Sequence, residues 1–331
     1  MDKISAMPRQ FDVIITAGDR AASRPVLQKN KVFLPIAGIP VINYVLSAVE
    51  RARCTARIIV VGDQARLEEA LTLPNNPFQG QRPLTVLEQS NTICENVWNA
   101  FLHTLPGYQA GMDWHSFSDA NADKAVLVMS GDIPLATPEE IEEFVDSCDL
   151  TRYDYFLGLT TEATLRPYYP QAERSGVRMA YFTLRDLQVR QNNLHLVKPF
   201  RVGNLQHIQR AYEVRYQKEW RNVAKLIWQM VAARDVSLRT FGAIASLHVA
   251  RLISRFGWQS IPLFRPFFLD LPMLASLASQ LLRTRFTTVM THYGGCTIDV
   301  DNAEHYQAIC ANFTNWLKHQ ALLAQELKQQ A

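Results

Sequence analysis

The sequence has little excess charge and few cysteines. Its 331 residues contain 34 Lys and Arg against 31 Asp and Glu, which leaves a net charge of +3. Because so small a balance produces no basic field of the kind that attracts nucleic acid, we expect no nucleic-acid partner. No two cysteines form a Cys-x-x-Cys pair; they are Cys54, Cys94, Cys148, Cys296 and Cys310. This scatter argues against a zinc site or a disulfide framework and fits a reducing cytoplasm.

The chain also lacks any segment with the composition of a membrane span or a secretory signal. Residues 1–10 carry charge without an apolar core, so we expect no signal peptide. The stretch 241–282 is rich in apolar residues, but Arg251, Arg255 and Asp270 interrupt it. A bilayer span needs about 20 residues that are largely free of charge. We therefore expect no integral membrane span and a cytoplasmic location.

An apolar run near the start of the chain ends in a turn of small residues. Residues 12–18 read Asp-Val-Ile-Ile-Thr-Ala-Gly, and residues 31–40 read Lys-Val-Phe-Leu-Pro-Ile-Ala-Gly-Ile-Pro. Such a run is typical of a buried first strand whose following loop offers backbone N–H groups to an anion, and Lys31 adds a positive charge for phosphate. Taken alone, an ordinary turn and a surface lysine explain these residues equally well.

A second informative segment, residues 124–135, reads Lys-Ala-Val-Leu-Val-Met-Ser-Gly-Asp-Ile-Pro-Leu. Its apolar part predicts a central strand, and Thr137 followed by Pro138 predicts the start of a helix. Asp132 is thereby placed at the carboxyl end of the strand, where open α/β sheets bind ligands. An aspartate there could also cap a turn, but Thr137 already serves as the helix cap.

A third segment lies close to the end of the chain. Residues 294–306 read Gly-Gly-Cys-Thr-Ile-Asp-Val-Asp-Asn-Ala-Glu-His-Tyr, so Asp299 and Asp301 stand two residues apart before a predicted helix that begins near Ala303. Asp301 fits the N-cap of that helix as well as it fits a ligand-binding role.

In this order, the three segments resemble the signature of nucleotidyltransferases of the MobA-like and sugar-nucleotide pyrophosphorylase type. Lys31, Gly38 and Pro40 match the second half of the family's N-terminal motif. Residues 131–134 match its Gly-Asp-x-Pro segment, and residues 299–304 match its closing turn. The resemblance covers the first half of the chain and its C-terminal quarter.

The glycine loop departs from the family pattern. Arg20 stands where a second glycine belongs, and Ala22 stands where an arginine belongs. Arg20 or Arg24 could take over the phosphate contact, because a guanidinium group presents a planar fork that suits phosphate oxygens.

The resemblance implies roles for individual residues. It places a nucleotide-binding set at Thr16, Ala17, Gly18, Asp19, Arg20, Arg24, Lys31, Gln89 and Asn91. It implies a Mg²⁺ ion bound by Asp132 together with Asp299, with Asp301 as the second choice. The implied catalytic set is Lys31, Asp132 and Lys198, of which Lys198 would face an acceptor phosphate. A polar loop with a helix cap explains Gln89 and Asn91 equally well, and Lys198 also fits a solvated lysine before a turn.

The implied activity is that of a Mg²⁺-dependent nucleotidyltransferase. A phosphorylated small-molecule acceptor would attack the α-phosphorus of a nucleoside triphosphate and release pyrophosphate. Chemistry of this kind depends mainly on positioning and charge neutralisation, so it needs no Ser/His/Asp array. Two alternatives stay open: a catalytically inactive nucleotide-binding regulator, and a GT-A-type glycosyltransferase that uses a sugar nucleotide.

Strand and helix patterns alternate through the first 160 residues, which predicts an α/β fold with helices on both faces of a largely parallel sheet. The resemblance implies the Rossmann-like, mixed sheet of GT-A-like nucleotidyltransferases. We expect strands at 13–15, 56–62, 84–88 and 155–159 and helices at 39–51, 64–71 and 93–102. Residues 177–199 resemble a β excursion with a turn at 191–193.

The change of pattern after residue 204 suggests a division of the chain. We expect residues 1–204 to form the α/β core, 205–290 a helical insertion, and 291–331 the closing strand and C-terminal helix of the core. The insertion is basic on one side and apolar on the other. It either packs on the core, forms a homodimer contact or lies on a membrane surface, and packing is the commonest use of such a composition.

Overall fold

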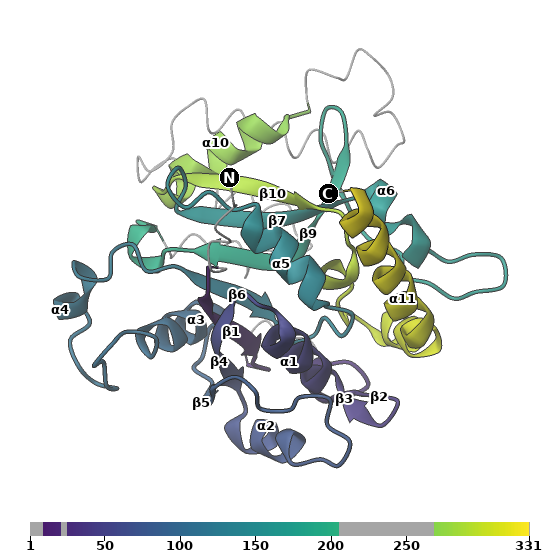
Figure 1. The fold of residues 1–331 in the computed structure, drawn as a ribbon, viewed down its shortest axis with the longest axis horizontal. Coiled ribbons are helices and arrows are strands. Elements are labelled where there is room, and N and C mark those ends of the chain that lie inside the picture. The colour runs from purple at the N-terminus through teal and green to yellow at the C-terminus, as the bar shows by residue number, and fades with distance from the viewer. Residues whose placement is uncertain (1–8, 21–24, 205–267, 331) are drawn as a thin grey trace, which may run out of the picture.

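The computed structural model describes residues 9–20, 25–204 and 268–330. Within these residues the centre is an eight-stranded mixed sheet with the order β10-β7-β9-β6-β1-β4-β5, in which β8 pairs with β9 (Figure 1). Its strands are β1 (Phe11–Ala17), β4 (Thr55–Gly62), β5 (Leu84–Glu88), β6 (Val126–Ser130), β7 (Tyr155–Thr161), β8 (Phe182–Thr183), β9 (Gln188–Val197) and β10 (Phe286–Thr291). Strands β1, β4, β5 and β6 are parallel neighbours, as are β7 and β10, whereas β9 is antiparallel to β6 and β7. The predicted Rossmann-like, mostly parallel sheet is confirmed.

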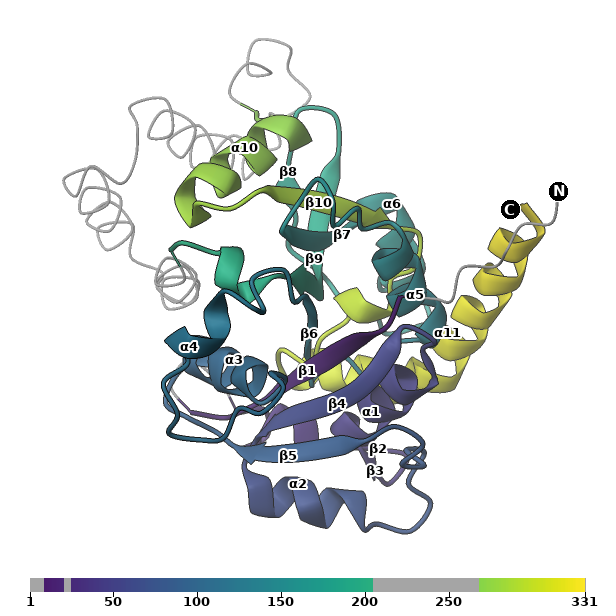
Figure 2. The same cartoon turned by 60° about the vertical axis from the view of Figure 1, so that its left-hand side comes forward.

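Helices cover both faces of the sheet (Figures 1 and 2). The described helices of four or more residues are α1 (Val41–Arg51), α2 (Gln64–Leu71), α3 (Ile93–Leu102), α4 (His115–Ser118), α5 (Pro138–Asp146), α6 (Glu162–Leu165), α10 (Leu271–Leu282) and α11 (Ala303–Gln330). Because successive side chains of a strand point to opposite faces, Val13 and Ile15 of β1 pack in the cluster that contains α1 and α5. Ile14 packs on the other face, in the cluster that contains α3.

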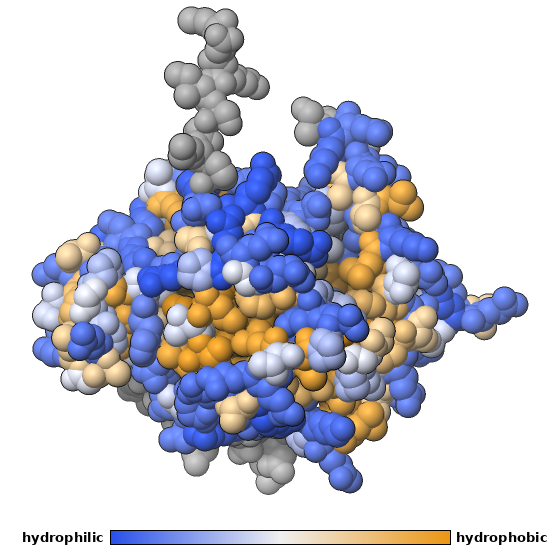
Figure 3. All heavy atoms as spheres, turned by 60° about the horizontal axis from the view of Figure 1, so that its bottom comes forward, coloured by the Kyte–Doolittle hydropathy of each residue, from blue (hydrophilic) through white to orange (hydrophobic). Residues whose placement is uncertain are grey.

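Helix α11 extends the core beyond the sheet. With the preceding turn, it packs against residues of the β2–β3 ribbon (Pro35–Ile36 and Ile39–Pro40) and of the segment after α6. The fully buried Trp316 of α11 lies edge-on to Tyr168, with ring centroids 5.3 Å apart. On the face drawn in Figure 3, hydrophobic side chains gather in a central hollow that hydrophilic residues border.

The local signals in the sequence set several boundaries. The predicted ranges 64–71, 84–88 and 93–102 agree with α2, β5 and α3. Thr92 caps α3 in a reciprocal capping box with Glu95, and Thr137 caps α5. The helix expected from residue 39 begins instead at Val41, because Ile39–Pro40 pair with Pro35–Ile36 as the β3 strand of the small ribbon.

The predicted turn at 191–193 is wrong. Strand β9 runs without interruption from Gln188 to Val197, and its register with β7 shifts between Leu157 and Leu159. The bulge turns the buried Asn192 toward β10, where its amide donates to the Thr291 hydroxyl at 3.0 Å. The polar Gln-Asn-Asn sequence therefore marks an irregularity inside a central strand. In the β excursion expected at 177–199, the part before β9 contains one short strand, β8 at Phe182–Thr183.

The last strand of the sheet, β10, begins at Phe286 and pairs in parallel with β7. It therefore lies almost entirely within the range 205–290, for which we expected a helical insertion. Much of that range, residues 205–267, lies outside the described residues. In the parts of the chain that the structure describes, no helix combines the length and the apolar character needed to cross a bilayer.

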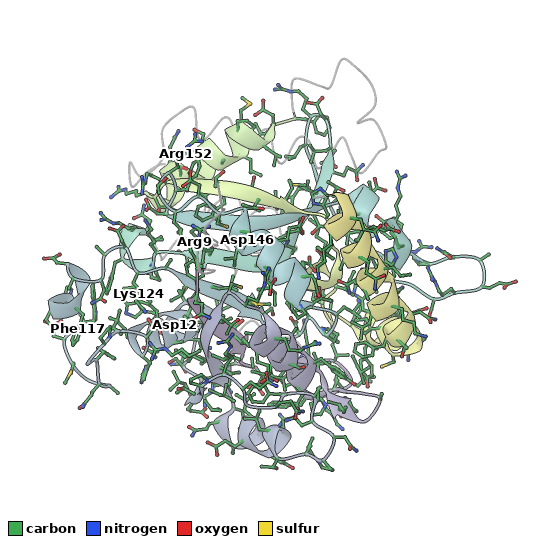
Figure 4. All side chains as sticks on the ribbon, in the orientation of Figure 1. Arg9, Asp12, Phe117, Lys124, Asp146 and Arg152 are labelled. Carbon is green, nitrogen blue, oxygen red and sulfur yellow. The ribbon has the colours of Figure 1, made fainter. Side chains whose placement is uncertain are left out.

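Charged side chains tie together the amino edge of the sheet. Asp12 at the start of β1 accepts from Arg57 of β4 at 2.7 Å, and its other oxygen lies 2.8 Å from the ammonium of Lys124 (Figure 4). Arg9 reaches the end of α5, where its guanidinium donates to the Cys148 carbonyl at 2.9 Å. The candidate site residues gather at the opposite, carboxyl edge of the sheet.

Candidate active site

Strands β1 and β6 end side by side at the carboxyl edge of the sheet. The Gly131 N–H donates to the Thr16 carbonyl at 2.8 Å, and the Thr16 hydroxyl donates to the Met129 carbonyl at 3.3 Å. A Cβ atom at Gly131 would lie only 3.0 Å from that Thr16 oxygen, so glycine allows the close approach of the two strand ends. The loops that start at Gly18 and Asp132 are thereby neighbours.

The loop after β1 is closed against the end of β5 by Gln89. The Asp19 N–H donates to Gln89 Oε1 at 2.8 Å, and Gln89 Nε2 returns a hydrogen bond to the Asp19 carboxylate at 2.8 Å. Arg20 donates to the Gln89 carbonyl at 2.9 Å and to the Glu88 carboxylate at 3.0 Å. A Cβ atom at Gly18 would lie 2.9 Å from Gln89 Oε1, so the loop passes directly over this buried amide.

Asn91, another residue of the predicted nucleotide-binding set, does not take part in this contact. Asn91 is exposed, and its backbone N–H donates to Glu95 beside the α3 capping box. Arg24 lies outside the described residues. Beside the loop, the structure has a cavity of about 240 Å³ whose walls include Asp19, Lys29 and Arg66.

Lys31 is buried between two carboxylates. Its ammonium lies 3.4 Å from the nearer oxygen of Asp132 and 3.3 Å from that of Asp301. The preceding residue, Asn30, positions this lysine. Its side chain donates to the Ala17 carbonyl at 3.2 Å and accepts from the Val32 N–H at 3.2 Å, so it fixes both neighbours of the site.

The C-terminal segment brings two aspartates to the same place. The Val300 N–H donates to the Asp132 carbonyl at 3.0 Å, which puts Asp299 and Asp301 on either side of this contact. Arg190, near the start of β9, lies 2.8 Å from Asp299 and 3.6 Å from Asp301. Burial, followed by the charge of Asp301, raises the pKa of Asp299 to about 6. Arg190 could not be predicted from the sequence, because no motif surrounds it and its strand was expected to turn nearby.

Lys198 is not part of this group. Strand β9 runs antiparallel to β6, with Val197 opposite Val126 at the start of β6, so Lys198 lies at the amino edge of the sheet. There its ammonium lies 3.2 Å from Asp154 and donates to the Leu150 carbonyl at 3.0 Å. The sequence around Lys198 carried no information about strand direction, and the structure separates this residue from Asp132.

The carboxylates suit a hard cation. Among the described residues, no group of three or more His, Cys, Asp or Glu side chains has an arrangement that could hold a metal ion by itself. Mg²⁺ in phosphate-transfer sites needs only one or two carboxylates, since water and substrate phosphates supply its other ligands. Asp132 and Asp301, which share the ammonium of Lys31, provide donors of that type.

The parallel strands, the loop over Gln89 and the acidic group around Lys31 lie together at the carboxyl edge of the sheet. Residues 13–175 match the model of the MobA-like NTP transferase domain. The protein is a transferase of the nucleotidyltransferase class. More particularly, residues 13–175 form a domain that belongs to the MobA-like NTP transferase family.

A solved structure of a transferase shares the fold. A hypothetical transferase from Thermus thermophilus superposes with a TM-score of 0.57 at 19% identity, over 89% of this chain and 99% of that one. Lower scores are found for 4-diphosphocytidyl-2C-methyl-D-erythritol synthase from Anaerococcus prevotii (0.41, 13% identity, 92% and 98% coverage). CMP:2-keto-3-deoxy-manno-octonic acid synthetase in complex with CTP gives 0.42 at 12% identity, with 93% and 99% coverage. No curated protein matches the sequence.

Proposed function

We propose that the protein transfers a nucleoside monophosphate from a nucleoside triphosphate to a phosphorylated small-molecule acceptor and releases pyrophosphate, with Mg²⁺ as cofactor. The observation that carries this proposal is the convergence of Lys31, Asp132 and Asp301 beside the Gly18 loop. The group joins a buried ammonium, suited to phosphate, with carboxylates suited to a divalent cation. Its position at the carboxyl edge of a parallel sheet is where such folds bind ligands.

Each residue of the group has a proposed task. Lys31 pairs with a phosphate oxygen of the triphosphate, and the backbone of residues 16–19 with Gln89 and Arg20 forms the wall beside it. Asp132, with Asp301 or Asp299, holds the Mg²⁺, which when bound supplies positive charge to the phosphate oxygens. Arg190 is our candidate for the acceptor phosphate in place of Lys198, because its guanidinium already lies at this edge within 2.8 Å of Asp299.

Binding of a phosphate group requires Lys31 and Arg190 to exchange their ion-pair partners. Lys31 and Arg190 are paired with the three aspartates, so an incoming phosphate competes for both cations. Phosphate brings negative charge and the divalent cation balances the aspartates, so the exchange of partners conserves charge neutrality. Such preorganised charge is the main contribution that a protein makes to this type of transfer.

The test measures pyrophosphate release from each of the four nucleoside triphosphates with Mg²⁺ over a panel of phosphorylated sugars and alcohols. We expect release with at least one pair of substrates. Asp132→Asn and Asp301→Asn should each lower turnover about 100-fold or more. The matched control is Asp119→Asn, an exposed aspartate of the segment after α4. Near wild-type release by both site variants would contradict the metal assignment.

One observation favours the regulator as a second candidate. The Asp19 N–H and the Arg20 guanidinium, which would contact phosphate, are both occupied by the end of β5 through Gln89 and Glu88. A protein that binds a triphosphate in the panel without releasing pyrophosphate from any of them would have this function. Activity on a preformed sugar nucleotide alone would identify a glycosyltransferase instead.

Cysteine chemistry supports the proposed cytoplasmic location. The structure shows no disulfide among the described residues, which include all five cysteines, and Cys54, Cys148 and Cys296 are buried. Burial raises the pKa of the Cys54 and Cys148 thiols to about 12, which keeps them protonated and unreactive at neutral pH. We propose residues 205–285, the part of the expected insertion that precedes β10, as the place of any homodimer contact.

A further inference from the structure

A second cavity lies against the C-terminal helix, α11. It has a volume of about 510 Å³ and is formed by the segment from α6 to residue 174 on one side and by α11 on the other. Figure 1 shows α6 and α11 as neighbours at one end of the sheet. None of its lining residues belongs to the candidate active site. Its size is that of a pocket for a small organic molecule.

The lining is basic and contains no carboxylate. Two guanidinium groups, Arg166 and Arg174, line one wall, and His319 lines the other. The amide side chains of Gln171 and Asn315 complete the polar part. Glu162, which does not line the cavity, has its carboxylate 4.0 Å from the Arg166 guanidinium. Two full positive charges without an acid in the wall match a doubly charged anion better than a singly charged one.

The backbone holds this wall in place. Gln171 and Arg174 form an isolated bridge, with N–H to carbonyl distances of 2.9 Å and 3.1 Å. Arg174 Nη2 also donates to the Pro167 carbonyl at 2.8 Å. The guanidinium of Arg174 is therefore preorganised, so binding an anion costs little side-chain entropy.

Two hydrogen-bond donors of the same cavity have no acceptor within the described part of the chain. Trp316, which is 1% exposed, lines the cavity, and its indole Nε1 has no hydrogen-bond partner among the described residues. The same holds for Nε of Arg174. Buried donors are almost always paired in folded proteins, so these two N–H groups, one from each wall, call for an acceptor that the described residues do not provide.

We propose that this cavity, formed by Arg166, Arg174, Trp316 and His319, is a second ligand site that binds a phosphate monoester with an apolar or planar substituent. The phosphate dianion pairs with the two guanidinium groups, and its oxygens accept from the unpaired donors. The substituent lies against the apolar part of the wall, which Pro167 and the Trp316 ring supply.

The cavity is connected to the candidate active site by the chain that follows it. Val177 donates to the Tyr168 carbonyl at 2.8 Å behind the wall, and three residues later the Ala180 carbonyl lies 3.4 Å from Arg190 Nη1. The chain therefore leads from the wall of this cavity directly to the contact with Arg190.

The test is calorimetric titration of the full chain with phenyl phosphate at low ionic strength. We expect one saturable site whose affinity falls about 10-fold or more in Arg166→Gln and in Arg174→Gln. Arg166 is exposed, so its variant keeps the fold even if Arg174→Gln does not. The control Arg152→Gln, an exposed arginine outside the cavity, should bind like the wild type. Benzoate, a monoanion of similar shape, should bind more weakly than phenyl phosphate.

Three results would overturn the proposal. The first is no binding of phenyl phosphate at about 10 mM, well above the range of a specific site. The second is equal affinity in the wild type and Arg166→Gln. The third is binding that Lys31→Ala abolishes while Arg166→Gln retains it, because the ligand would then occupy the candidate active site.

Discussion

At the scale of single residues, buried polar side chains decide how the site is held. Glu140 of α5 is fully buried, and its carboxylate accepts from the Cys296 N–H at 2.8 Å. It thereby ties the helix after Asp132 to the turn before Asp299. Burial raises the pKa of Glu140 from 4.5 to about 7. The folded state then keeps a proton that the unfolded chain has lost between these two pH values.

The stability contributed by this protonated carboxyl is fully present below pH 4.5 and is lost as the pH rises through about 7. We expect Glu140→Gln, which stays neutral, to gain stability relative to the wild type between about pH 5 and about pH 8. Urea unfolding at several pH values measures the difference. The exposed Glu69→Gln of α2 is the control and should show no such trend. A difference that is constant with pH would refute the assignment.

Gly158 in β7 is required by the bulge in β9. A Cβ atom at this position would lie only 2.0 Å from Oδ1 of the buried Asn192. We expect Gly158→Ala to lower the free energy of unfolding by about 1–3 kcal/mol, the usual cost of overpacking a core. Thermal unfolding measures it. In an Asn192→Ala background the cost of Gly158→Ala should shrink, and equal costs in both backgrounds would mean that Asn192 is not the cause.

At the scale of elements, short signals fix where helices begin beside the site. The capping box of α3 unites the Thr92 hydroxyl with the Glu95 N–H at 3.2 Å and the Glu95 carboxylate with the Thr92 N–H at 3.2 Å. Through the same carboxylate Asn91 is held directly after the Gln89 loop. The start of this helix therefore also fixes the backbone that follows Gln89 beside the candidate site.

We expect Thr92→Ala to reduce the free energy of unfolding by about 1 kcal/mol, because one N–H group of the first turn loses its acceptor. Thr314→Ala, an exposed threonine inside α11, is the matched control and should be neutral or slightly stabilising, since alanine favours helix. Chemical denaturation compares the two. Equal effects would show that the capping contact has no special value.

At the scale of the whole molecule, the candidate site unites residues far apart in the chain. Lys31, Asp132, Arg190 and Asp301 meet at one edge of the sheet because β1, β6 and β9 are adjacent and the segment at Val300 bonds to Asp132. A ligand that contacts all of these residues can bind only the folded chain, because only folding brings them together. Its binding therefore stabilises the entire fold.

We expect a nucleoside triphosphate with Mg²⁺ to raise the melting temperature of the wild type, with a gain of about 2.7 kcal/mol at a ligand concentration 100-fold above Kd. Lys31→Ala should remove most of this increase, whereas Lys328→Ala near the end of α11 should preserve it. Differential scanning calorimetry with and without ligand measures the shift. An undiminished shift in Lys31→Ala would show that the triphosphate binds elsewhere.

The sequence by itself determined the class of fold and the three segments of the candidate site, which contain Lys31, Asp132 and Asp301. Apolar runs, caps and turn residues are local signals, and they predicted α2, β5, α3 and the position of Asp132 after a central strand. The same local reading failed where the outcome depended on distant neighbours. The Asn192–Asn193 pair looked like a turn, yet it lies in a continuous strand because Thr291 and the Cys296 carbonyl accept its amides.

Only the tertiary structure decided that Arg190, and not Lys198, lies beside Asp299. Lys198 and Arg190 lie at opposite ends of one strand, and the antiparallel direction of β9 places Arg190 at the edge with Asp299 and Lys198 at the edge with Asp154. Strand direction depends on pairing with β6 and β7, which no local pattern contains. The physical reason is that hydrophobic periodicity reports which face of a strand is buried but not which way the strand runs in the sheet.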